Sequence, residues 1–230
     1  MSLQRVKLFR VQANVDILKI YNKFVEYKYN DEDFGFYDTG FLEEGILFSS
    51  YTEKLEYNET TYDPYGNYLE EISYVNYKRV RFHIEKISNN VFLLALYDSP
   101  NGIKSFFDNI AKIFEYRIGF NPLFIDICNF MSVLKDDYGV STFGSGKLKV
   151  SRVTIDNNSK ASIEISSIKD SFNALNILIG DKNYLIDKVT SSFSLNGKDV
   201  NFELSKSGTI KVNEDDWKYL LDIIKKSIND

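Results

Sequence analysis

The chain has 230 residues, enough for one large domain or two small ones with a buried core. Its apolar fraction of 43% and aromatic fraction of 15% exclude a disordered protein. No apolar run approaches the roughly 18 residues that a membrane-spanning helix needs. The N-terminus lacks the apolar core of a signal peptide, and the single cysteine, Cys128, cannot form an internal disulfide. We therefore expect a cytoplasmic protein without a membrane segment.

Charge is distributed very unevenly along the chain. The net charge is −5, but residues 31–71 contain twelve acidic residues and one base, Lys54. This segment carries −11, so the remaining residues sum to +6. Asn, Lys, Ile, Tyr and Phe are plentiful throughout, which suggests an AT-rich bacterial or phage genome.

The N-terminal residues predict a strand, a helix and a loop. Alternating apolar residues indicate a strand over residues 5–12. Asn14 is a suitable N-cap for a helix that continues to about Tyr27. Residues 31–45 are polar, acidic and interrupted by glycine, which is typical of a loop.

A long hairpin is expected next. A strand is predicted over residues 46–57, and residues 64–67 (Pro-Tyr-Gly-Asn) predict a turn, because proline presets φ and glycine accepts positive φ. Residues 68–77 then form the return strand. It leads into a stretch in which Val80, Phe82 and Ile84 alternate with Arg79, Arg81 and His83. Such alternation indicates a half-buried strand with a wet, basic face.

A buried strand and a capped helix complete this unit. After a turn at residues 88–90, the continuous apolar run of residues 91–96 predicts a strand covered on both faces. Ser99 and Pro100 are suitable for the N-cap and first position of a helix whose apolar residues recur at helical spacing over residues 103–114.

The assignment of residues 122–137 is left open between helix and strand. Asn121-Pro122 resembles a helix start, but Phe124-Ile125 also fit a strand. Residues 139–146 contain three glycines and several hydroxyl side chains, so they are the best candidate for a boundary between two halves.

The second half predicts a set of strands closed by a helix. Strands are expected over residues 147–155, with a bulge near Arg152, and over residues 161–166, 184–195, 200–204 and 209–212. Asp170 can cap a short helix, and Asn196-Gly197 is a strong hairpin signal, because both residues tolerate positive φ. Asn213 and Asp216 predict a capping box for the last helix.

Together these patterns predict an α+β fold with largely antiparallel sheets and amphipathic helices packed on one face. The expected domains are residues 1–138, with an acidic tyrosine-rich hairpin, and residues 147–230, joined by the loop 139–146. Each half ends in a sheet followed by a capped helix, so the halves could be related.

No catalytic, metal or cofactor site emerges from the spacing of the residues. The segment 144–147 resembles a phosphate-binding loop only superficially, since position 141 is serine, position 148 is leucine and a strand follows. His83 is the only histidine, so a zinc site of Cys/His type cannot be built. The acidic run from Asp31 lacks the ligand pattern of a calcium loop. These patterns favour a non-enzymatic protein over an enzyme, and a hydrolase that uses scattered carboxylates and a metal ion is kept as a third alternative.

The main hypothesis is a non-enzymatic binding or assembly module that engages a basic protein. Tyrosine provides a large contact area at low entropic cost, so a tyrosine-rich acidic hairpin suits such a partner. The alternative is that these tyrosines pack on their own sheet. The predicted partner-binding residues are Glu43, Glu44, Glu53, Glu56, Tyr57, Glu59, Tyr62, Asp63 and Tyr65.

A second hypothesis is a nucleic-acid-associated subunit of a larger bacterial or phage complex. Its binding surface would be the basic strand face, with phosphates contacting the cations and bases stacking on aromatic rings. The residues concerned are Lys78, Arg79, Arg81, His83 and Lys86. Pairing of these cations with the neighbouring acidic strand would explain the same pattern more simply.

Overall fold

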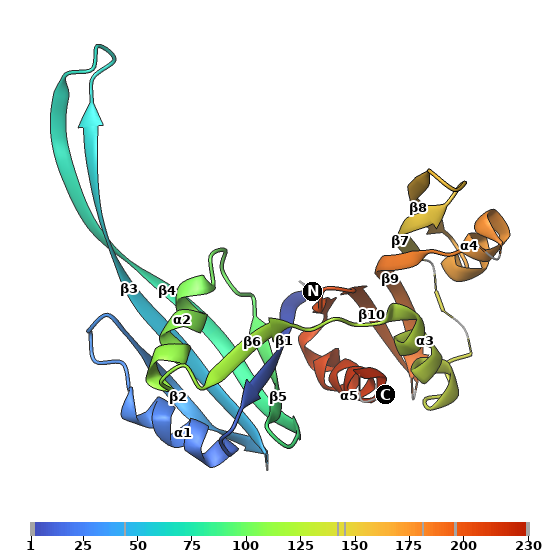
Figure 1. The fold of residues 1–230 in the computed structure, drawn as a ribbon, viewed down its shortest axis with the longest axis horizontal. Coiled ribbons are helices and arrows are strands. Elements are labelled where there is room, and N and C mark those ends of the chain that lie inside the picture. The colour runs from blue at the N-terminus through green and yellow to red at the C-terminus, as the bar shows by residue number, and fades with distance from the viewer. Residues whose placement is uncertain are drawn as a thin grey trace. The chain divides into compact units, whose positions relative to one another are not determined.

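The computed structural model describes residues 3–43, 45–141, 143–144, 146–180, 182–195 and 197–228. Strands dominate the fold (Figure 1). The strands are β1 (Gln4–Ala13), β2 (Phe34–Glu43), β3 (Ile46–Tyr62), β4 (Tyr68–Ser88), β5 (Val91–Tyr97), β6 (Ile118–Pro122), β7 (Gly146–Thr154), β8 (Lys160–Ser167), β9 (Leu185–Leu195), β10 (Lys198–Ser205) and β11 (Thr209–Val212). The helices are α1 (Ile17–Glu26), α2 (Lys104–Ile113), α3 (Ile127–Asp136), α4 (Ser171–Ile179), the 3₁₀ turn η1 (Glu214–Asp216) and α5 (Trp217–Ile228). None of the helices within the described ranges has the length and apolar character needed to span a membrane.

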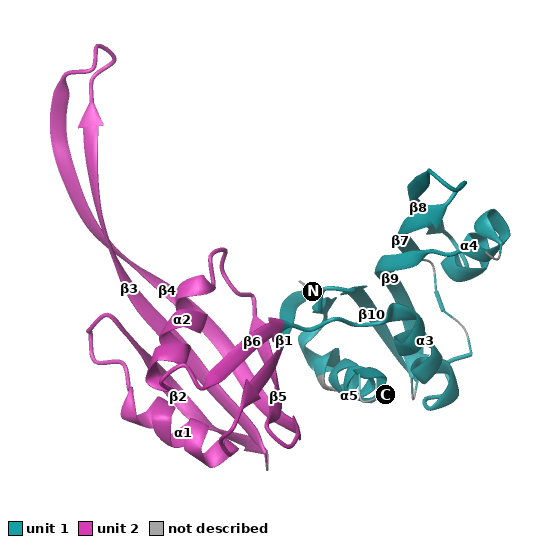
Figure 2. Ribbon diagram, viewed as in Figure 1, with its two compact units in different colours: residues 1–9, 122–230 teal, residues 10–121 magenta. Residues whose placement is uncertain are grey.

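The chain forms two compact units, shown in different colours in Figure 2. Unit 1 comprises residues 1–9 and 122–230, and unit 2 comprises residues 10–121. The boundaries between these units follow residues 9 and 121, whereas the sequence led us to expect a boundary in the loop 139–146. The division into domains 1–138 and 147–230, and any relation between the halves, stay predictions.

Unit 2 is built on a sheet with the strand order β2-β3-β4-β5-β1. The pairs β2–β3, β3–β4 and β4–β5 are antiparallel. Phe82 on β4 is central to its core. The Phe82 ring contacts Phe24 of α1 at a centroid distance of 5.6 Å and Phe106 of α2 at 5.3 Å. Both helices therefore contact the same buried side of β4, and burial of such rings is the main stabilising term for this unit.

Unit 1 contains the strand order β11-β10-β9-β7-β8, and the first residues of β1 pair with β11. Its core includes Phe202 on β10, which contacts Phe130 of α3 and Phe193 of β9, each at 5.7 Å. The predicted bulge is confirmed, because the β7–β8 register shifts between Val150 and Val153 and Arg152 has a φ of 56°. The predicted hairpin between β9 and β10 is also confirmed, although Asn196 itself lies outside the described residues. That all helices pack on one face stays a prediction.

One predicted loop is a strand. Residues 31–45 were expected to be irregular, but Phe34–Glu43 form β2, which pairs with β3. The strand is irregular, since Asp38 has a φ of 51° and the register shifts between Tyr37 and Gly40. These interruptions destroy the two-residue alternation by which strands are recognised in a sequence.

The predicted helix starts are also corrected. The N-cap of α1 is Asp16 rather than Asn14, and its side chain accepts the Lys19 amide. Helix α2 begins after Ile103 and has no side-chain cap, so Ser99 and Pro100 lie before it. The ambiguous residues 122–137 form a helix only from Ile127, capped by Asp126. Asn213 forms no side-chain cap bond at the start of η1, which replaces the predicted capping box.

Candidate functional site

Strands β3 and β4 continue beyond the rest of their sheet as a two-stranded ribbon (Figure 1). Pairing of β2 with β3 ends at Glu53, and pairing of β5 with β4 begins only at Arg81. Between these limits, as far as the described ranges show, β3 and β4 pair only with each other, up to Tyr62 opposite Tyr68. We call residues 55–76 the arm. The arm contains five acidic residues and no basic residue, so it carries a charge of −5.

The turn at the tip of the arm uses the carboxylate of Asp63. One oxygen accepts the backbone amides of Tyr65 at 2.9 Å and Asn67 at 2.8 Å, and the other accepts the Asn67 side-chain amide at 2.8 Å. These bonds, chiefly that from the Asn67 side chain, hold the pKa of Asp63 below its ordinary value. Asp63, predicted to bind a partner, is therefore engaged in holding the turn.

The register of the hairpin separates the arm into two faces. Directly opposed residues of an antiparallel pair point to the same side, and successive residues point to opposite sides. The face that continues the buried side of β3 and β4 is called the aromatic face. It comprises Leu55, Tyr57, Glu59, Thr61, Glu70, Ile72, Tyr74 and Asn76. The opposite face is called the polar face, and comprises Glu56, Asn58, Thr60, Glu71, Ser73 and Val75.

The aromatic face exposes apolar surface beside unpaired carboxylates. Tyr57 and Tyr74 stack across the strands with ring centroids 5.2 Å apart and planes inclined by 18°. Their side chains remain 42% and 47% exposed, and the neighbouring Ile72 is 41% exposed. Within the described part of the chain, Glu59 and Glu70 take part in no ion pair. This face therefore combines contact area with uncompensated negative charge.

On the polar face, three of the polar side chains have partners within the arm and its root. Ser73 donates a hydrogen bond to the Asn58 side chain at 2.8 Å. Lys54 forms an ion pair with Glu56 at 2.7 Å, and the hydrogen bond from Lys54 lowers the pKa of Glu56. The charge of Glu56 is thus already compensated.

A polar network fixes the root of the arm to α2. The Glu53 carboxylate accepts a hydrogen bond from Ser105 at 2.6 Å and lies 3.5 Å from the ammonium of Lys78, its cross-strand neighbour. Lys78 also donates to Ser105 at 2.8 Å and to the Gly102 carbonyl at 2.9 Å. Glu53, predicted from sequence as a partner-binding residue, is therefore part of this structural network.

The remaining predicted partner residues lie at the ends of the hairpin. Tyr62 and Tyr65 are exposed at the tip, by 60% and 90%. Glu43 is the last residue of β2, and Glu44 lies outside the described residues. The sequence prediction did not include Glu70, Ile72 and Tyr74, although alternation along the predicted strand 68–77 places these three residues on one face.

The residues of the predicted basic face do not form one surface. His83 was expected to be wet but is 2% exposed, and its ring lies against the side chain of Tyr97 on β5, with Nδ1 2.6 Å from the Tyr97 hydroxyl. Lys78 and Lys86 belong to the side of β4 opposite to Arg79 and Arg81. Arg81 lies 3.7 Å from Asp98. The cross-strand pairing expected for the basic row is realised for Lys78 with Glu53.

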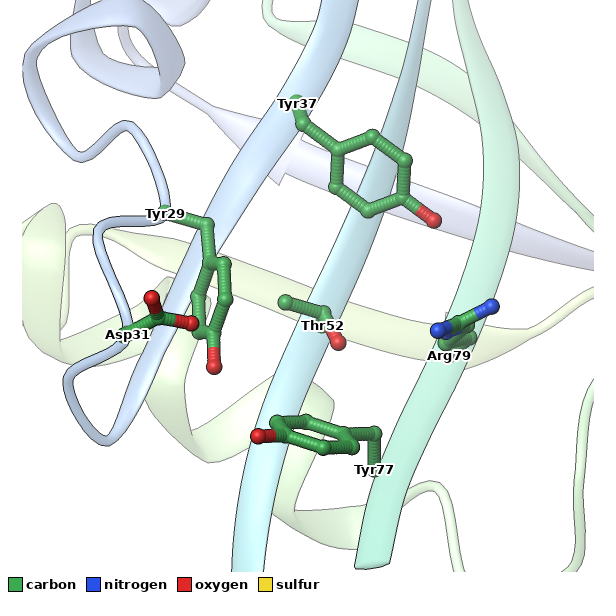
Figure 3. Close-up of a pocket in the computed structure, with 6 residues that line it drawn as sticks. All are labelled: Tyr29, Asp31, Tyr37, Thr52, Tyr77 and Arg79. Carbon is green, nitrogen blue, oxygen red and sulfur yellow. The ribbon is translucent and has the colours of Figure 1, made fainter.

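A pocket of about 360 Å³ lies at the root of the arm, on the side of the sheet that continues the polar face. Figure 3 shows the rings of Tyr29, Tyr37 and Tyr77 around Thr52, with Asp31 beside Tyr29. Arg79 from β4 completes the lining. Desolvation raises the pKa of Tyr29, so its hydroxyl stays protonated and can donate hydrogen bonds at neutral pH. The pocket therefore offers aromatic surfaces, hydroxyl groups and one charge of each sign.

In the described ranges, no group of three or more His, Cys, Asp or Glu side chains is arranged to hold a metal ion.

Comparison of the sequence with models of known protein families and with curated proteins gives no match. The function is therefore inferred from the arm and the pocket themselves.

Proposed function

We propose that the chain is a non-enzymatic binding and assembly module that docks a basic protein partner on the aromatic face of its arm. The observation that supports this proposal most strongly is the contrast between the two faces. The aromatic face leaves Tyr57, Ile72 and Tyr74 exposed beside the carboxylates of Glu59 and Glu70. On the polar face, Ser73 hydrogen-bonds to Asn58 and Glu56 is paired with Lys54.

The physical chemistry of a ribbon favours this function. A two-stranded hairpin is at best marginally stable alone in water, because it buries little apolar surface. The arm nevertheless extends for eight residues beyond Lys54 on β3 and holds a well-bonded turn at its tip. Covering Tyr57 and Tyr74 would bury aromatic surface of the kind that dominates interface energetics. Complementary charge at the rim would accelerate association with a basic partner and select against acidic proteins.

The experiment compares two neighbouring charge reversals. Glu70 lies on the aromatic face and Glu71 on the polar face, so Glu70→Lys and Glu71→Lys have the same composition and net charge. Each tagged full-length variant is used to capture proteins from an extract of the organism that encodes the chain. A stoichiometric basic protein should be captured by the native chain and by Glu71→Lys, and at least about tenfold less by Glu70→Lys.

A matched apolar pair extends the test. Ile72 on the aromatic face and Val75 on the polar face are exposed to similar extents, 41% and 48%. Ile72→Ser should weaken capture and Val75→Ser should not. Equal losses for both members of each pair, or no effect of any substitution, would contradict the proposal.

A second candidate function is binding of single-stranded nucleic acid at the pocket. The observation in its favour is that Arg79 lines the same pocket as the rings of Tyr29, Tyr37 and Tyr77 (Figure 3). Rings of this kind stack on bases, and a guanidinium contacts phosphate. The affinity should then fall steeply with added salt and with Arg79→Glu. No binding of an oligonucleotide at low salt would exclude this candidate.

A further inference from the structure

The two long edges of the arm are open. In the described part of the chain, no strand adjoins β3 past Lys54 on the side that β2 occupies, and none adjoins β4 before Arg81 on the side that β5 occupies. Each edge therefore presents a row of backbone N–H and C=O groups.

Soluble proteins protect such edges with proline, lysine or a bulge. The edge of β4 has a bulge, because Tyr62 pairs with Tyr68 while Thr61 pairs with Glu70. The β3 residues 55–61 contain neither proline nor lysine and keep an unbroken register.

The direction of the backbone groups on β3 follows from one hydrogen bond. The Lys54 amide donates to the Asp33 carbonyl at 2.8 Å, so it points away from β4. Backbone groups alternate in direction along an antiparallel strand. The amides of Glu56, Asn58 and Thr60 consequently point outward to the open edge, whereas those of Tyr57 and Glu59 point toward β4.

The two edges differ in charge. The edge of β3 begins beside the acidic run Asp31-Glu32-Asp33, which immediately precedes β2, and carries Glu56 and Glu59. Lys54 is the only base in this set of residues. The open edge of β4 carries the carboxylates of Glu70 and Glu71 but also the cation of Arg79. A basic segment is therefore attracted more strongly to the edge of β3.

We propose that the basic partner adds an extended strand to the edge of β3 along residues 55–61. The added strand would hydrogen-bond to the outward amides and carbonyls and place alternate side chains beside the aromatic face. Main-chain bonds supply affinity in this mode of recognition, and alternate side chains supply specificity. Pairing between the arms of two copies is opposed by the −5 charge on each arm. The inference depends on the proposed function, since it specifies how the same arm binds.

The first test uses a synthetic capped peptide of ten residues in which lysine and valine alternate. Amide hydrogen exchange of the full-length, ¹⁵N-labelled chain is measured with and without this peptide. The amides of Glu56, Asn58 and Thr60 should become protected. Protection of the Ser73 and Val75 amides instead, or of no arm amide, would overturn strand addition. Arm-dependent dimerisation of the chain alone, measured by light scattering, would also overturn it.

Two proline substitutions, one on each edge of the arm, provide the control. Thr60→Pro removes an outward N–H without removing a bond to β4, so peptide binding should weaken about tenfold relative to Thr60→Ala. Val75→Pro removes an outward N–H from the other edge and should leave binding unchanged. Continued protection of the Tyr57 and Glu59 amides would show that the hairpin of each variant is intact.

The outcomes separate this inference from the proposed function. If Glu70→Lys prevents partner capture but Thr60→Pro does not weaken peptide binding, strand addition is overturned and docking on the aromatic face stands. If Glu70→Lys and Glu71→Lys capture the partner equally, both proposals fail.

Discussion

Neutralising Glu53 should loosen the root of the arm, and the structure sets the size of the effect. Removing one partner of a fully buried ion pair costs about 3–5 kcal/mol, whereas exposed pairs contribute about 0–1 kcal/mol. The side chains of Glu53 and Lys78 are 14% and 16% exposed, which places this pair between the two cases. Lys78 also retains Ser105 and the Gly102 carbonyl as acceptors. We therefore expect Glu53→Gln to lower the free energy of unfolding by about 1–2 kcal/mol.

The assay is urea denaturation of the full-length chain, with Glu56→Gln as the matched control. Glu56 lies on the same strand, but its ion pair with Lys54 is exposed on the polar face. Its substitution should leave the unfolding midpoint nearly unchanged. A double-mutant cycle with Lys78→Met should give a coupling energy of about 1 kcal/mol between Glu53 and Lys78. Equal effects of Glu53→Gln and Glu56→Gln, or no coupling, would refute the assignment of Glu53 to a structural network.

Three further changes test other parts of unit 2. Because the folded pKa of Asp63 is lowered, its contribution to stability is complete above its unfolded pKa of about 4 and is lost as the pH falls through the folded value. The protection factors of the tip amides, measured relative to their intrinsic exchange rates at each pH, should accordingly fall at acidic pH, and they should lose this pH dependence in Asp63→Asn. Tyr97→Phe removes the 2.6 Å contact with buried His83, so urea unfolding should show a loss of about 1–2 kcal/mol. Gly35→Ala would place a Cβ 2.5 Å from the Tyr29 Cα, and thermal unfolding should reveal a cost of about 1–3 kcal/mol.

Much of unit 2 was predictable because its signals are local. The alternation of Val80, Phe82 and Ile84 identified β4, and the continuous apolar run identified β5, which is buried over Phe92–Leu96. The turn at the tip was encoded by the sequence around Gly66, whose φ of 86° few other residues adopt. Such features depend on residues that are neighbours in the chain.

Other features depend on tertiary structure and were missed. Alternation predicts that His83 and Phe82 point to opposite sides of the sheet, but it does not predict what covers the His83 side. In the structure the Tyr97 hydroxyl contacts the imidazole on that side. Strand β2 was hidden because Gly35 approaches the Tyr29 backbone and Asp38 adopts positive φ, which gives the segment the composition of a loop.

The candidate site was predictable as a region but not as a surface. The acidic, tyrosine-rich tract was evident from composition alone. The separate roles of its carboxylates depend on the cross-strand register, which pairs Glu53 with Lys78 and places Glu59 and Glu70 on the same face. Whether these carboxylates bind a partner stays a prediction.

The most direct test of the central claim is hydroxyl-radical footprinting of the arm tyrosines in the isolated chain and in its complex with the captured basic protein. Tyr57 and Tyr74 on the aromatic face and Tyr77 on the opposite side are all exposed, by 42%, 47% and 43%. In the complex, Tyr57 and Tyr74 should become protected from oxidation while Tyr77 keeps its reactivity. Protection of Tyr77 with unchanged oxidation of Tyr57 and Tyr74 would contradict docking on the aromatic face.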